Sequence, residues 1–118
     1  MRQQLPADVQ APALARQAVR RELHDSLGTD ELADIQLMVS ELVTNSVLHS
    51  APRAGDVTLE VDANHPIRVM VSDRGDEFSL DHGGGTGGWG LALVERLSDR
   101  WGLARGDGTR VWFEMDRN

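Results

Sequence analysis

Apolar residues recur at spacings of three and four along two stretches near the N-terminus, and this spacing predicts two amphipathic helices. The first stretch runs from Gln10 to Leu27, with a proline in its first turn and a glycine directly after its end. The second begins at Thr29, a suitable N-cap followed by two acidic residues, and continues to about His49. The N-terminal part of the chain is therefore predicted to form a pair of helices.

Beyond these helices the pattern changes to an alternation of apolar and polar residues, which is typical of strands with one buried face. The alternating segments form two pairs, each joined by a short turn: 57–61 with 67–72, and 101–105 with 109–115. Helical spacing returns between the pairs, in 91–97. Turns this short cannot make parallel crossovers. We expect an α+β fold of two layers, in which helices cover one face of a mostly antiparallel, mixed sheet.

Composition limits the kinds of protein that the chain can be. Its 118 residues, 40% of them hydrophobic, suit a single domain, 1–118, with one core. A formal net charge of -7 gives no positive field for nucleic acid, so we expect no direct nucleic-acid partner. The absence of cysteine excludes disulfides, thiolate zinc sites and a cysteine nucleophile. No apolar stretch approaches the roughly 20 residues that span a bilayer, and no signal-like segment is present, so we expect a cytoplasmic protein with no membrane partner.

A polar stripe lies on the second predicted helix. Glu41, Asn45 and His49 are spaced four residues apart and so lie almost in line on one helical face. An amide oxygen suits a Mg²⁺ ion that also holds phosphate and water, and a carboxylate one turn away can hold a water or hydroxyl for attack on phosphate. The alternative is a solvated helix face with no chemistry.

Asp73 and Gly75 follow the strand predicted over 67–72. A carboxylate can accept a hydrogen bond from the exocyclic amine of adenine, and a glycine lets the backbone approach the ring. The alternative is an ordinary Asp-x-Gly turn at a strand end. Thr109, which opens the last strand, either reaches the same pocket or is an ordinary strand threonine.

Six glycines occur in the eight residues 83–90, directly before the predicted helix 91–97. Free amides at a helix start favour an anion, and glycines let the backbone close over phosphates, whereas the alternative is a flexible loop over 75–88. The run also satisfies the dinucleotide pattern G-x-G-x-x-G. We reject that reading because no strand abuts the first glycine and an antiparallel sheet contains no βαβ unit.

These segments, in this order, resemble the GHKL ATPase superfamily, which includes gyrase-type topoisomerases, heat-shock chaperones, sensor histidine kinases and mismatch-repair ATPases. Within it the chain most resembles the small bacterial anti-sigma factors that are serine/threonine-protein kinases. The resemblance covers nearly the whole chain. It rests on Leu5–Ala7, Glu41–His49, Val71–Gly75, Gly88–Val94 and Gly108–Phe113.

The resemblance implies a Bergerat-type ATP-binding fold with ATP and Mg²⁺ as cofactors. By this likeness Asn45 would ligate the metal and Glu41 would be the general base. Asp73 would accept the adenine amino group, with Gly75 against the ring and Thr109 in the hydrogen-bond network around the base.

The likeness also assigns the glycine run, where Gly88 and Gly90 would close on the phosphates. One position departs from the family pattern, because Glu77 stands where the fuller D-x-G-x-G motif has its second glycine. This departure bears on the hinge of the loop and on the packing beside the base, which the likeness alone does not assign.

The function that the resemblance implies is an ATP-binding anti-sigma factor that sequesters a sigma factor and phosphorylates an anti-anti-sigma (STAS-type) antagonist, with a homodimer as a family expectation. A second hypothesis is a catalytically silent module whose binding to a regulatory partner is gated by ATP. Two further readings are the detached catalytic domain of a sensor histidine kinase and an adhesive structural domain without nucleotide. The first of these lacks room for a dimerisation helix pair with a phospho-accepting histidine.

Overall fold

The computed structural model describes residues 1–49, 56–73, 87–106 and 108–116. Within them the chain forms three helices and five strands. In chain order these are β1 (Arg2–Leu5), α1 (Ala11–Leu23), α2 (Thr29–His49), β2 (Val57–Asp62), β3 (Ile67–Asp73), α3 (Gly87–Leu97), β4 (Arg100–Gly106) and β5 (Gly108–Met115).

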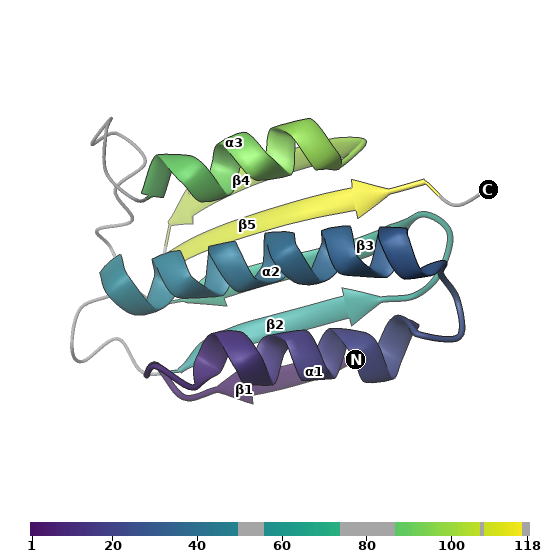
Figure 1. The fold of residues 1–118 in the computed structure, drawn as a ribbon. Helices are drawn as coiled ribbons and strands as arrows, with labels where there is room; N and C mark the ends of the chain where they lie inside the picture. The colour runs from purple at the N-terminus through teal and green to yellow at the C-terminus, as the bar shows by residue number, and fades with distance from the viewer. Residues whose placement is uncertain (50–55, 74–86, 107, 117–118) are drawn as a thin grey trace.

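The strands form one sheet in the order β1-β2-β3-β5-β4, and all three helices lie on the same face of it (Figure 1). This confirms the predicted two-layer α+β fold. The expectation of a mixed sheet was wrong in one respect, because each pair of neighbouring strands in the described residues is antiparallel. The helix α3 carries the chain back so that β3 and β4 run in the same direction, but β5 lies between them and is antiparallel to both (Figure 1).

Three element bounds differ from the sequence predictions. The edge strand β1 was not predicted, because Leu5 is its only buried residue and no alternation is visible over four residues. The helix α1 ends at Leu23, four residues before the expected end at Leu27. The helix α3 begins at Gly87 rather than at residue 91, although glycine disfavours a helix interior.

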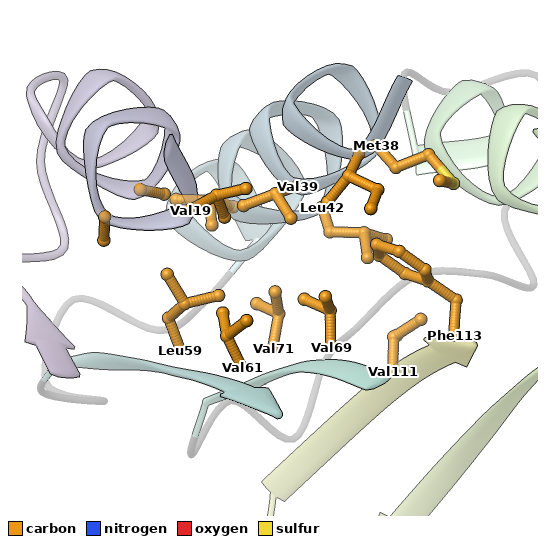
Figure 2. Close-up of a cluster of buried hydrophobic side chains, with 14 of the residues drawn as sticks. Val19, Met38, Val39, Leu42, Leu59, Val61, Val69, Val71, Val111 and Phe113 are labelled. Atoms are coloured by element: carbon orange, nitrogen blue, oxygen red, sulfur yellow. The ribbon is translucent and has the colours of Figure 1, made fainter. Parts of the chain in front are cut away.

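The core lies between the helices and the sheet. Figure 2 shows side chains of α1 and α2 pointing toward the strands, and their sheet partners are apolar and buried. Labelled there are Val19, Met38, Val39, Leu42, Leu59, Val61, Val69, Val71, Val111 and Phe113. Burial of one such side chain stabilises the fold by roughly 1.5–3 kcal/mol. The central helix α2 contacts α1, α3, β2 and β3, so it fixes the position of the whole helical layer.

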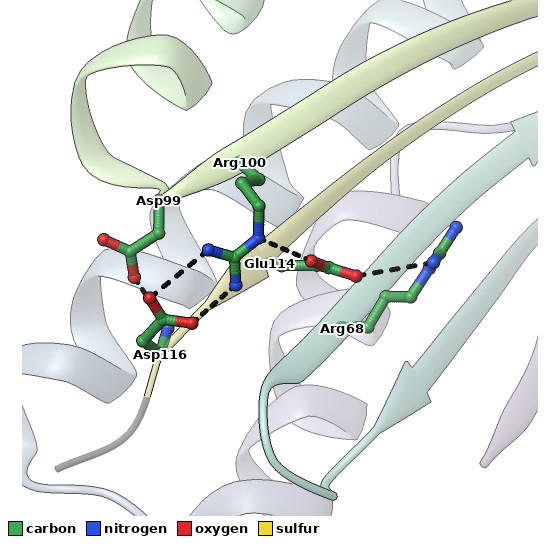
Figure 3. Close-up of polar contacts among 5 residues, drawn as sticks. All are labelled: Arg68, Asp99, Arg100, Glu114 and Asp116. Atoms are coloured by element: carbon green, nitrogen blue, oxygen red, sulfur yellow. Dashed lines mark hydrogen bonds and ion pairs between the residues drawn. The ribbon is translucent and has the colours of Figure 1, made fainter.

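The other face of the sheet carries charged side chains that pair across strands (Figure 3). Arg68 and Arg100 both bind Glu114, at 3.4 and 2.8 Å, and Arg100 also binds Asp116. The hydrogen bond from Arg100 holds the pKa of the Asp116 carboxyl below its ordinary value. Such a lowered pKa stabilises the fold above the ordinary aspartate pKa, and the contribution is lost as the pH falls through the lowered value. Because these groups are exposed to solvent, the contribution is small.

Trp112 lies flat on this open face, next to Gly102 of the neighbouring strand. The guanidinium carbon of Arg68 is 4.7 Å from the centre of the Trp112 ring, which is the arrangement of a cation–π contact. A Cβ atom added at Gly102 would lie 2.6 Å from the nearest Trp112 ring atoms. The indole can therefore occupy this place only because residue 102 has no side chain.

Replacement of Gly102 by alanine is predicted to destabilise the fold by roughly 1–3 kcal/mol, because the added methyl group must displace Trp112. Chemical denaturation followed by tryptophan fluorescence measures the change. Gly106→Ala is the matched control, since a Cβ atom at that position of the same strand has nothing within 4 Å. Equal stabilities of the two variants would contradict the prediction.

Candidate functional site

The four segments that carry the predicted site residues meet at one end of the molecule. Figure 1 shows the C-terminal ends of α2 and β3 at the same end as the starts of α3 and β5. These segments are separated in sequence, and the order of the sheet brings them together because β5 pairs directly with β3. Residues 41–49, 73, 87–90 and 109 therefore lie toward a common edge of the fold.

The sheet supplies a buried polar pair at this edge. On the helix-covered face, β3 and β5 place Val69 opposite Phe113 and Val71 opposite Val111, and the next row is Asp73 opposite Thr109. Asp73 is 9% exposed and Thr109 is 3% exposed. Both residues take part in polar or electrostatic interactions within the protein, and a few polar groups at the end of an apolar core are the kind of lining that ligand pockets have.

The helix α2 supplies polar groups from the other layer. Asn45 is 1% exposed, so it lies in the interior and not on a solvated helix face. Glu41, one turn earlier, is half-buried. The side chain of His49, at the end of α2, lies outside the described residues. The alternative interpretation of this stripe as a solvated helix face therefore does not describe Asn45.

The glycine-rich segment is described only in part. Gly88 and Gly90 belong to the first turn of α3, so the expectation that Gly88 lies in a loop was wrong. The first amides of a helix have no partner within the helix and point along its axis, which makes such a turn suitable for an anion. Gly75 and Glu77 lie outside the described residues, as does most of the predicted loop 75–88.

The donor set fits an adenine nucleotide with one metal ion. Asp73 offers acceptor oxygens for an amine, and Asn45 offers a neutral oxygen of the kind that Mg²⁺ accepts beside phosphate and water. Within the described residues no three His, Cys, Asp or Glu side chains gather as a metal cluster. A Mg²⁺ ion held by Asn45 would take its other ligands from phosphate oxygens and water.

A surface recess of about 510 Å³ lies elsewhere, beside the turn between β2 and β3. Its lining includes Glu22, Glu60, Asp62 and Arg68, and it contains none of the predicted site residues. Three carboxylates in the wall make it a poor place for a triphosphate. The polar end of the core is the better candidate.

The class of protein follows from the family to which the sequence matches, the histidine kinase-like (GHKL) ATPases, and the two-layer fold agrees with it. Residues 5–115 match the family model described as the histidine kinase-like ATPase domain, and the chain belongs to this family. No curated protein sequence matches the chain. Among the helices of the described residues, none has the length and apolar character needed to cross a membrane.

Two solved structures are similar in fold. The crystal structure of the RsbU and RsbW domains of Rv1364c from Mycobacterium tuberculosis matches with a TM-score of 0.79 and 23% identity, over 98% of this chain and 31% of that chain. The histidine kinase domain of the blue-light activated histidine kinase EL346 from Erythrobacter litoralis matches with a TM-score of 0.61 and 21% identity, over 94% and 61%. The chain thus spans less than two thirds of either relative, and at these identities the likeness concerns the fold.

Proposed function

We propose that the chain binds Mg·ATP at the polar end of its core and acts as an anti-sigma factor that phosphorylates a serine or threonine of a STAS-type antagonist. The observation that carries the proposal is the buried pair of Asp73 and Thr109, at the edge where α2 buries Asn45. The match to the histidine kinase-like ATPase family supports the proposal, and so does the similarity in fold to a structure that contains an RsbW domain.

The adenine ring of ATP would be held by Asp73. Its carboxylate would accept a hydrogen bond from the exocyclic amine of adenine, and Thr109 would join the same network from the neighbouring strand. A hydrogen bond to a charged group contributes roughly 1.5–3 kcal/mol, and more is lost when the buried partner is left alone. This contact would therefore favour adenine over bases that lack an amine at that edge.

The triphosphate would lie between α2 and the start of α3. Asn45 would hold the metal, and the amides of the first turn of α3, which includes Gly88 and Gly90, would bind phosphate oxygens. When bound, Mg²⁺ supplies positive charge that neutralises the phosphate oxygens during transfer. In this arrangement the backbone amides of α3 and the side-chain amide of Asn45 would position the phosphates and their metal without a lysine, a residue that the chain lacks.

Phosphoryl transfer requires a base for the attacking hydroxyl, and Glu41 is the candidate. Its carboxylate lies one helical turn from Asn45 and is half-buried, so it retains access to a protein substrate. The hydroxyl oxygen of the antagonist would bond to the γ-phosphorus while the bond to the bridging oxygen of ADP breaks. The hydroxyl proton would pass to Glu41.

The anti-sigma part of the proposal rests on the family resemblance of the motifs, and the similarity to a structure that contains an RsbW domain agrees with it. Such a protein would work in the cytoplasm, where its partners are a sigma factor and the antagonist. A homodimer is part of the same proposal.

Mg·ATP at one hundred times its dissociation constant should stabilise the protein by about 2.7 kcal/mol, visible as a rise of several degrees in Tm. Asp73→Ala should reduce the affinity roughly 10- to 100-fold, which at the same nucleotide concentration lowers the stabilisation to between about 1.4 and about 0.4 kcal/mol. Asp56→Ala, which changes an exposed aspartate before β2, is the control. If wild-type protein shows no shift at millimolar Mg·ATP, nucleotide binding is ruled out.

Glu41→Ala and Asn45→Ala should impair different steps, phosphoryl transfer in the first variant and nucleotide binding in the second. Loss of Asn45 should weaken Mg·ATP binding, whereas loss of Glu41 should leave binding intact and slow transfer of labelled γ-phosphate to the antagonist roughly 10²- to 10⁴-fold. Glu31→Ala, at an exposed position in the first turn of the same helix, is the matched control. Transfer that is unaffected by Glu41→Ala would exclude this base, and a stable complex without any phosphorylated partner would favour the ATP-gated binding module.

A further inference from the structure

The outward side of α2 carries two exposed leucines, whereas the other two leucines of this helix, Leu32 and Leu42, are buried. Leu37 is 45% exposed and Leu48 is 60% exposed. Figure 1 shows α2 between α1 and α3 with the sheet behind it, and none of the described elements lies over its outward side. Much of each leucine side chain therefore faces solvent.

The exposed leucines lie on the same side of α2 as Glu41. With about 100° of rotation per residue, the directions of Leu37, Glu41 and Leu48 fall within about 40° of one another. A rise of about 1.5 Å per residue places Leu37 about 6 Å before Glu41 along the helix and Leu48 about 10 Å after it. Thr44, in the same line, already donates its hydroxyl to the carbonyl of Ser40 at 2.7 Å. We call Leu37, Glu41, Thr44 and Leu48 the outer ridge of α2.

Exposure falls around α2 from the outer ridge toward the buried polar end of the core. The two leucines are exposed, Glu41 is half-buried, and Asn45, about 40° further round the helix, is 1% exposed. Glu41 therefore lies where the outer surface of α2 meets the interior. A protein that presents a hydroxyl to Glu41 from the solvent must lie on the outer ridge.

Helix formation alone does not account for leucine at these two positions. Glutamate, lysine and glutamine favour a helix about as well as leucine does, and they interact better with water. Single exposed apolar residues are common on protein surfaces, but here two of them lie in line with a half-buried carboxylate. The whole of α2 contains no lysine or arginine, so the ridge has no cation of its own helix for an anionic partner. Contact with a partner at this ridge would therefore be mainly apolar.

We propose that Leu37 and Leu48 are specificity-determining residues for the protein substrate, and that they bind apolar side chains on either side of the serine or threonine that Glu41 would deprotonate. This inference rests on the proposed kinase function. The two leucines are about 16 Å apart along the helix, a distance that about five residues of extended chain span. The occupant is a short exposed segment of the substrate protein, with its hydroxyl between two apolar side chains.

Leu37→Ser and Leu48→Ser test the inference. The probe is the STAS-type protein that accepts label when such proteins, purified from the same source, are offered one by one to the wild-type chain with labelled Mg·ATP. Each variant should raise KM for that protein roughly 3- to 10-fold, because about half of a leucine side chain is no longer buried by the substrate. The kcat at saturating substrate and the affinity for Mg·ATP should not change.

Nucleotide-free Tm should also stay the same in both variants, since the leucines are exposed. Ala104→Ser is the control for the kinetic measurement. Ala104 is exposed and pairs with Arg110, which places it on the open face of the sheet, away from the helices. This variant should leave KM, kcat and nucleotide affinity as they are in the wild type.

Thiol labelling provides a direct readout of contact, because the chain contains no cysteine and each new cysteine is its only thiol. Leu37→Cys and Leu48→Cys should react with a maleimide several times more slowly when the substrate protein and a non-hydrolysable Mg·ATP analogue are present. Ala104→Cys should react at the same rate with and without them. Mass spectrometry of the labelled chain gives the rates.

Four results would overturn the inference. Unchanged KM in the serine variants, with transfer by the wild type intact, removes the role of the leucines and leaves the proposed function standing. A raised KM without protection of the thiols shows that the leucines do not touch the substrate. A change of oligomeric state in light scattering with unchanged KM identifies the ridge as a contact between copies of this chain. Transfer by the wild type to none of the purified proteins removes the proposed function together with this inference.

Discussion

The register between β3 and β5 is the constraint on which the site depends. Two apolar rows, Val69 with Phe113 and Val71 with Val111, hold the strands against α2, and the third row is Asp73 with Thr109. Because side chains alternate between faces, a slip of one residue would turn Asp73 to the open face and bring a neighbour into the core. The same packing that stabilises the core thus fixes the Asp73 carboxylate at its edge.

This arrangement lowers stability locally. Buried polar groups such as Asn45, Ser46 and Asp73 occupy positions where apolar side chains would pack with less desolvation cost. The apolar rows toward the middle of the sheet and the α1–α2 pair offset that cost, while on the open face of the sheet arginines pair with Glu114. A core that is apolar at one end and polar at the other is the form expected of a binding domain that must leave room for its ligand.

The sequence alone predicted the parts of the fold that follow from local periodicity. The strands from Val57 and Ile67 were found because apolar and polar residues alternate, and α2 was found to within a residue at its start because Thr29 and two acids mark it. The register of Asp73 with Thr109 could not be predicted, since it depends on β5 lying between β3 and β4. The family is confirmed, whereas the roles of Glu41, Asn45, Asp73, Gly75, Gly88, Gly90 and Thr109 stay predictions.

Net charge sets a condition on how such a site can hold a triphosphate. A chain with a formal charge of -7 repels an anionic nucleotide at long range, but at physiological salt this repulsion is screened beyond about 8 Å. Binding must then rest on contacts at short range. The groups proposed for the phosphates and their metal are backbone amides at the start of α3 and the neutral amide of Asn45, and none of them carries a formal charge. Neutralisation is left to the metal, so the affinity for nucleotide is expected to depend on Mg²⁺ far more than on the ionic strength of the solution.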